Sequence, residues 1–137
     1  MSWYPDLGTD TMIASGSHIR AIGWLSSEYT FPVGEMSDEA SEKIGEFCRR
    51  WHESLGALGW SSFRGMHHCE FCRSFRSAGN VGLPAGNLLY VFPEMLAHYV
   101  DVHHYTPPGE FLQALQQAPL PGTTEYQQAI VPFLATK

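Results

Sequence analysis

Four residues set the strongest constraint on the fold of this chain. Cys69 and Cys72 are separated by two residues, His98 and His103 by four, and 25 residues lie between the two pairs. Cysteine and histidine pairs with these spacings are typical of a Cys2His2 zinc site. Two thiolates and two neutral imidazoles cancel the charge of Zn²⁺, so such a site can be buried. The sequence therefore predicts a bound zinc ion with a structural role.

The identity of the histidine ligands is less constrained than that of the cysteines. His67 lies two residues before Cys69 and is the alternate ligand, able to replace His98 or His103. On a regular helix, residues five positions apart are separated by about 140° around the axis. His98 and His103 can therefore reach one ion only if the helix tightens or opens near His103. We rank His98 and His103 first, and the spacing leaves the choice open.

Two other interpretations of the cysteine pair compete with zinc binding. A CxxC pair can be a redox dithiol, but that use is typical of a thioredoxin-like βαβ unit and gives no role to the seven histidines. The two thiols could also be unrelated small core residues. Zinc binding alone accounts for both cysteines and histidines. Cys48 lies on a regular apolar stripe and is expected in the core rather than at the metal.

Composition excludes several classes of protein. At 137 residues and 44% hydrophobic content, we expect residues 1–137 to form a single zinc-binding domain. A net charge of −6 with eight Lys and Arg residues argues against a nucleic-acid partner. The apolar runs fall far short of the ~20 residues of a membrane span, and no signal peptide is evident. Three cysteines, two spaced for a metal, indicate a reducing cytoplasm.

The pattern between the ligand pairs predicts how the chain returns to the site. Residues 80–83 and 88–92 are expected to form two strands joined by a turn at 84–87, and residues 19–25 and 60–64 are further strand candidates. A hairpin between the cysteines and the histidines would bring the two pairs together.

Helices are expected in the remaining periodic segments. The clearest spans residues 38–55, with Ser37 as its N-cap and one apolar stripe facing the core. A second is expected to start at Pro93 and carry both histidines, and two more to follow Thr106 and Thr123. The predicted fold class is α+β: a small antiparallel sheet or hairpin packed with three to four helices around a zinc site.

Several short segments together resemble a known family. The resemblance extends to about Leu115, and the segments that carry it are Tyr4-Pro5-Asp6-Leu7, Ile22-Gly23-Trp24-Leu25, the stretch 64–72, Ala97-His98-Tyr99, the stretch 103–108 and Glu110-Phe111. With them the chain resembles a domain of unknown function found in small bacterial proteins.

The resemblance adds to the ligand assignment but supplies no activity. It implies that the family's motif positions are matched here by His67, Cys69, Cys72, His98 and His103. His68 and His104 fall at positions that vary in the family. His67 is thereby supported as a candidate ligand beyond what the spacing indicates.

Three functional classes follow from these residues. The favoured one is a non-catalytic module with a structural zinc that binds another protein or a small ligand. The alternative is a zinc hydrolase with three protein ligands and a bound water, in which Glu70, Asp101 or a spare histidine is the base. In the structural case, Glu70 or Asp101 would orient a ligating imidazole. A regulatory nucleic-acid-binding finger ranks third because the chain is acidic.

Overall fold

The computed structural model describes residues 3–54 and 67–134. A three-stranded sheet has the order β1-β5-β4, from β1 (Ile19–Ala21), β4 (Asn80–Ala85) and β5 (Leu88–Pro93). β4 and β5 are antiparallel, whereas β1 runs parallel to β5. The helices are α1 (Asp38–Arg49), α2 (Leu96–His103), α3 (Gly109–Gln117) and α4 (Thr124–Leu134). The fold is α+β, as the sequence predicts.

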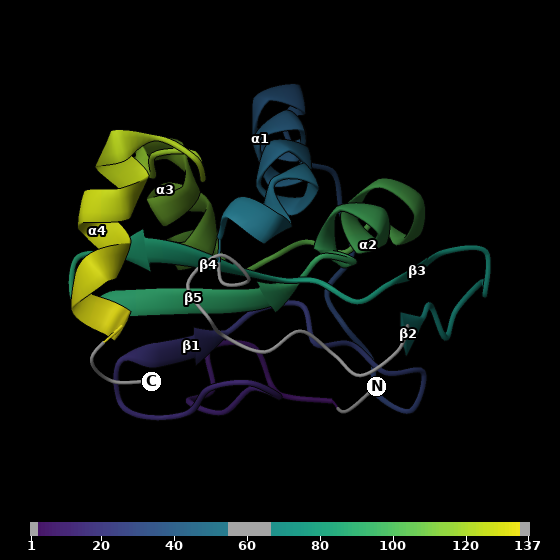
Figure 1. Ribbon diagram of the computed structural model, residues 1–137. Helices are drawn as coiled ribbons and strands as arrows, with labels where there is room; N and C mark the ends of the chain where they lie inside the picture. Colours follow the sequence, from purple (N-terminus) through teal and green to yellow (C-terminus); the bar gives the residue numbers. More distant parts are fainter. Residues whose placement is uncertain (1–2, 55–66, 135–137) are drawn as a thin grey trace.

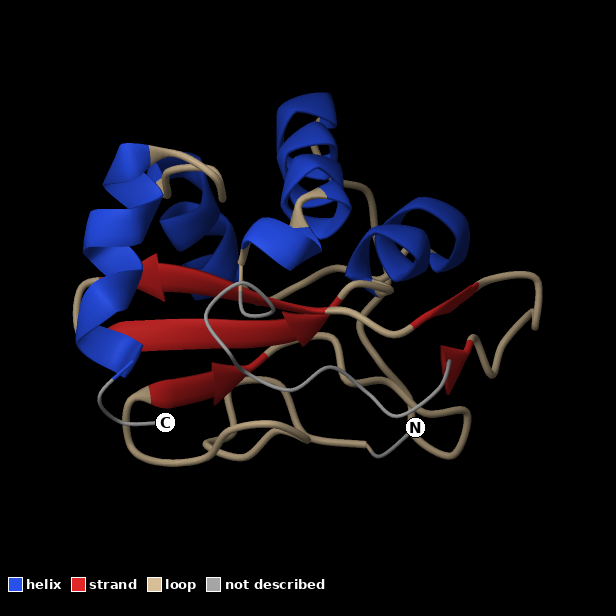
Figure 2. Ribbon diagram, in the orientation of Figure 1, coloured by secondary structure: helices blue, strands red, loops and turns tan. Residues whose placement is uncertain are grey.

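Helices and the N-terminal arm lie on different sides of the sheet. α1, α2 and α3 lie over one face, and α4 packs at the end where the β4–β5 turn lies (Figure 1). Residues 3–16 run along β1 on the side away from β5 (Figure 2). The largest fully buried side chains fill the space between these layers: Trp24, Tyr99, Tyr105, Tyr126, Phe47, Phe92 and Phe111. A second, two-stranded sheet of β2 (His67–His68) and β3 (Arg76–Ser77) lies near α2, at the other end of the molecule.

Helix α1 is shorter than predicted. Ser37 caps α1 as expected, with its Oγ accepting a hydrogen bond from the Ala40 N–H. The helix ends at Arg49 rather than continuing to residue 55, and a 3₁₀ turn follows at Trp51–Glu53. The Trp51 ring packs on Gly79, where an added Cβ would lie 2.4 Å from Trp51 Cδ2. Only glycine at position 79 leaves room for this ring. The strand predicted over residues 60–64 lies outside the described residues.

The hairpin is longer than predicted and its turn is shorter. Strands β4 and β5 extend to Ala85 and Leu88, which leaves Gly86 and Asn87 as the turn. Gly86 has a φ of 60°, and two-residue turns of this kind place glycine at the positive φ. Pro93 ends β5 and does not open a helix, since α2 begins at Leu96.

β4 is an edge strand, and side chains satisfy its outer backbone groups. The Gly82 N–H donates to Ser54 Oγ at 2.9 Å, and the Gly82 carbonyl accepts from the Tyr126 hydroxyl at 2.6 Å. Ser54 and Tyr126 are both buried. The network therefore joins the end of the 3₁₀ turn and α4 to the edge of the sheet.

The carboxylate of Asp6 connects the N-terminal arm to the segments that follow β1 and α2. It accepts hydrogen bonds from the Gly23 N–H at 3.0 Å and from the Tyr105 hydroxyl at 2.6 Å. Burial raises the pKa of Asp6, while these two hydrogen bonds act in the opposite direction. Three of the segments that carry the family resemblance thus meet at one side chain.

Gly23 is also the point at which α2 approaches the sheet. Its φ is 72°, and a Cβ there would lie 2.6 Å from Leu96 Cδ1. Glycine is required both by the left-handed backbone and by the close approach of Leu96. The start of α2 is therefore positioned by contact with this residue.

Gly23→Ala should destabilise the protein more than Gly86→Ala. Both replace a glycine of positive φ, which costs roughly 1–2 kcal/mol, but nothing lies within 4 Å of a Cβ at Gly86, whereas Leu96 must move to admit one at Gly23. Chemical denaturation of the two variants separates backbone strain from steric clash. Equal losses would show that the Leu96 contact does not constrain α2.

Candidate metal centre

The cysteines lie in a tight turn between β2 and β3. The Cys69 N–H donates to the Phe75 carbonyl at 2.9 Å, and the Arg73 N–H donates to the Cys69 carbonyl at 2.9 Å. Arg73 has a φ of 58°, which turns the chain back toward β3. The two-residue spacing thus places both sulfurs on one side of a closed turn, as metal ligation requires.

The histidines come from α2, and the last turn of this helix is widened. The His104 N–H donates to the Tyr99 carbonyl five residues earlier, and the Tyr105 N–H donates to the same carbonyl at 3.1 Å. His104 is in the left-handed conformation, with a φ of 58°. An i→i−5 bond is the π-type widening of a helix. The spacing requires a helix that tightens or opens near His103, and the structure has the opened form.

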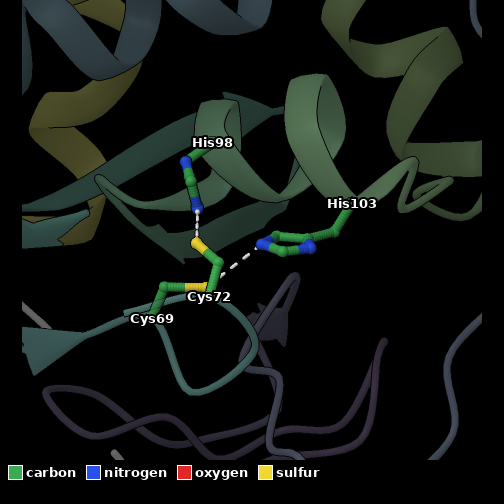
Figure 3. Close-up of side chains that lie close together, drawn as sticks. All are labelled: Cys69, Cys72, His98 and His103. Atoms are coloured by element: carbon green, nitrogen blue, oxygen red, sulfur yellow. Dashed lines mark hydrogen bonds between the residues drawn. The ribbon is translucent and has the colours of Figure 1, made fainter. Parts of the chain in front are cut away.

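The four side chains converge. His103 Nε2 lies 3.3 Å from Cys69 Sγ, and His98 Nε2 lies 3.3 Å from Cys72 Sγ (Figure 3). All four ligand atoms lie within 4.8 Å of one another, so the cluster could hold a metal ion. A zinc ion about 2.3 Å from sulfur and about 2.0 Å from nitrogen separates tetrahedral neighbours by about 3.5 Å. The two sulfur–nitrogen distances of 3.3 Å are close to this separation.

Aromatic rings from the cysteine turn hold the imidazoles. Phe75 stacks on His98 with ring centroids 4.7 Å apart and an interplanar angle of 9°. Phe71 lies 5.3 Å from the His103 ring and also contacts Tyr99. Sequence reasoning did not assign a role to either phenylalanine. Their positions are a signal for such a role, since Phe71 lies between the two cysteines and Phe75 lies three residues after Cys72.

The two thiols have different environments. Cys69 is fully buried, and this burial raises its pKa. Cys72 is exposed, and hydrogen bonds from the Ser74 side chain and backbone lower its pKa. The Ser74 Oγ lies 2.9 Å from Cys72 Sγ. Burial, together with the neighbouring His103, lowers the pKa of His98 and favours the neutral imidazole that binds metals.

Glu70, one of the two predicted supporting carboxylates, faces another part of the chain. Its Oε1 accepts hydrogen bonds from the Ser27 N–H at 2.9 Å and from the hydroxyls of Ser26 and Ser27. The Ser27 backbone bond is the main cause of its lowered pKa. Glu70 therefore ties the cysteine turn to residues 26–27.

Asp101, His68 and His104 are not members of the four-residue cluster. Asp101 is exposed on α2, and it lines surface hollows on both sides of that helix. His68 is exposed in β2, opposite Arg76, and His104 forms the C-cap of α2. The backbone of His67 pairs with Ser77, but its side chain lies outside the described residues. Its predicted role as alternate ligand stays a prediction.

Cys48 is separate from the cluster, as predicted from its apolar stripe. It lies on α1 and is 4% exposed. Burial raises its pKa to about 12. Such a thiol is a core residue of low reactivity.

Comparison with known proteins identifies a family. The sequence profile of a family described as a domain of unknown function (DUF7919) matches residues 2–116 of the chain. No curated protein and no solved structure matches the chain. The family match covers the cysteine turn and α2, and it ends before α4.

The length and hydropathy of the helices test for a membrane span. In residues 3–54 and 67–134, no helix has the length and apolar character needed to cross a bilayer.

Proposed function

We propose that this chain, which belongs to the DUF7919 family of domains of unknown function, binds one zinc ion through Cys69, Cys72, His98 and His103. The ion is structural and the protein is a binding module rather than an enzyme. The observation that carries the proposal is the convergence of two thiols and two imidazoles within 4.8 Å, from segments 26 residues apart (98 − 72).

The donor chemistry favours zinc over other divalent ions. Sulfur and imidazole ligands in a tetrahedral arrangement are typical of Zn²⁺, whereas Mg²⁺ and Ca²⁺ prefer oxygen ligands. A set of two thiolates and two neutral imidazoles also balances the charge of the ion. Four protein donors complete the coordination, and closed sites of this kind are structural.

A structural ion would stabilise a part of the fold that has little regular secondary structure. β2 and β3 have two residues each, and an isolated pair of such short strands is not stable in water. An ion held jointly by this turn and by α2 contributes its binding free energy to folding. Since thiolates must stay reduced to bind, the proposal fits a reducing compartment such as the cytoplasm.

The alternative of a zinc hydrolase requires an open coordination position and a nearby base. Glu70 is engaged with Ser26 and Ser27, and its lowered pKa makes it a weak base. The four donors leave no position for a metal-bound water if all of them bind. The engagement of Glu70 with Ser26 and Ser27 favours the structural role.

One exposed aromatic pair is suited to contact a protein or small-molecule partner. Trp3 and Tyr29 stack with ring centroids 4.0 Å apart, and they are 37% and 47% exposed. The segment that carries Tyr29 is bonded to the cysteine turn through Glu70. Exposed aromatic side chains of this kind are enriched at binding surfaces. The ion would thus help to order the surface on which this pair lies.

The purified protein should contain about one equivalent of zinc, held by two sulfur and two nitrogen ligands. Elemental analysis after purification without chelator measures the content, and X-ray absorption spectroscopy counts the ligands. An oxygen ligand in place of one nitrogen would favour the hydrolase alternative. A substoichiometric content that added zinc does not restore under reducing conditions would overturn the assignment.

Cys69→Ser and Cys72→Ser should each destabilise the protein, whereas Cys48→Ala should cost about 1 kcal/mol. Loss of one thiolate leaves an incomplete site, and we expect a loss of at least about 3 kcal/mol, or roughly 10 °C in Tm. Thermal melts with and without chelator test this. Chelator should lower the Tm of the parent and of Cys48→Ala but not that of the other two variants. Identical melts for all four proteins would contradict a structural ion.

Single histidine variants should identify the nitrogen ligands. His98→Ala and His103→Ala should weaken zinc binding by at least about a hundredfold, and His67→Ala by much less. His68→Ala, at an exposed neighbouring position, is the matched control. Competition with a chromophoric zinc chelator gives the affinities. Strong loss at His67 and at only one of the other two would establish the alternate ligand set.

A further inference from the structure

We propose that Cys72 is a modification site for hydrogen peroxide and related hydroperoxides, and that its oxidation joins it to Cys69 and releases the metal. The inference rests on the proposed zinc site and goes beyond it, because it assigns different roles to the two cysteines.

The two sulfurs differ in their access to solvent. Cys72 is exposed at the tip of the turn between β2 and β3, and its neighbours Arg73 and Ser74 are exposed as well. Cys69 has no exposed surface. An oxidant from solvent therefore meets the Cys72 sulfur first, whereas the Cys69 sulfur is reached only from inside the cluster.

The turn also supplies the partner thiol for a disulfide. The Cys69 and Cys72 sulfurs lie within 4.8 Å of each other and are separated by two residues. A disulfide of about 2.05 Å requires a small movement of a short turn. Cys48, the other free cysteine, is 4% exposed on α1 and is not part of the cluster. The geometry therefore selects one disulfide.

The reaction proceeds in two steps that balance. The Cys72 thiolate attacks the peroxide, an S–O bond forms, the O–O bond breaks, and the departing hydroxide takes a proton to become water. The Cys69 thiolate then attacks the sulfenic sulfur, an S–S bond forms, and the second hydroxide leaves and takes a proton. Two thiolates lose two electrons and the peroxide gains them. Overall, two protons are consumed and two waters are formed.

The metal leaves because the oxidised site has too few ligands. A disulfide no longer supplies thiolates, so only His98 and His103 remain, and two imidazoles do not hold zinc in a closed tetrahedral site. The turn then keeps its own hydrogen bonds, the bonds of Glu70 to Ser26 and Ser27, and the contacts of Phe71 and Phe75 with α2. Oxidation would thus release the ion and weaken the attachment of the cysteine turn to α2, leaving the ring contacts of Phe71 and Phe75.

The test is to titrate the reduced, zinc-loaded protein with hydrogen peroxide. Free zinc is measured with a chromophoric chelator, and thiols are mapped by differential alkylation and peptide mass spectrometry. We expect one zinc released for each disulfide formed between residues 69 and 72, with the Cys48 thiol still reduced. Dithiothreitol with added zinc should restore the loaded protein. Cys48→Ala is the matched control and should give the same stoichiometry.

The order of attack is tested in Cys69→Ser, in which Cys72 has no partner thiol. Dimedone should trap a sulfenic acid at residue 72 in this variant, and the labelling of Cys69 in Cys72→Ser should be at least about tenfold slower. Equal labelling rates would overturn the assigned roles. The two variants are compared only if their circular dichroism spectra match that of the parent. If they do not match, the order of attack is read from dimedone labelling of Cys72 in the parent, sampled before the disulfide accumulates.

The outcomes distinguish this proposal from the proposed zinc site. A protein that binds no zinc but still forms the 69–72 disulfide through a Cys72 sulfenic acid would refute the metal site and keep the modification site. A protein that holds its zinc while both thiols stay reduced, or that forms a disulfide through Cys48, would refute the modification site alone.

Discussion

The hydrogen bonds of the Asp6 carboxylate determine where the other parts of the fold meet. Asp6 lies in the N-terminal arm, Gly23 follows β1, and Tyr105 comes two residues after His103. The same Gly23 receives Leu96 at the start of α2. Both ends of α2 are thus held by one short region of the arm and the sheet. Since His98 and His103 lie on this helix, the direction in which they point depends on a carboxylate that is remote from them in sequence.

The elements that follow local rules could be predicted from the sequence. Ser37 before an acidic first turn specifies the start of α1, and two short apolar runs on either side of a glycine-containing turn indicate β4 and β5. The meeting of the four ligand residues could also be predicted, because the spacing of Cys69, Cys72, His98 and His103 reflects the geometry of a common centre. The helix start and the strands follow from residues close in sequence, whereas the ligand residues are recognised by their type and spacing.

Features that depend on distant contacts could not be predicted in the same way. The parallel pairing of β1 with β5 depends on contacts across about 70 residues. Pro93 has the properties of a first helical residue, but the pairing of β5 with β4 places it in the sheet. The end of α1 depends on the packing of Trp51 against Gly79. In each case a tertiary contact overrides a local preference, and a single sequence does not contain a pattern for it.

The hydrogen bonds of Gly82 to Ser54 and Tyr126 join the part of the chain that matches the family to the helix beyond it. The family match ends at residue 116, whereas Tyr126, which satisfies the Gly82 carbonyl, lies in α4. A chain that shares only the matched residues must satisfy this carbonyl in another way, because an unpaired strand edge invites pairing with a second chain. In this protein, the C-terminal helix therefore protects the sheet against intermolecular strand addition.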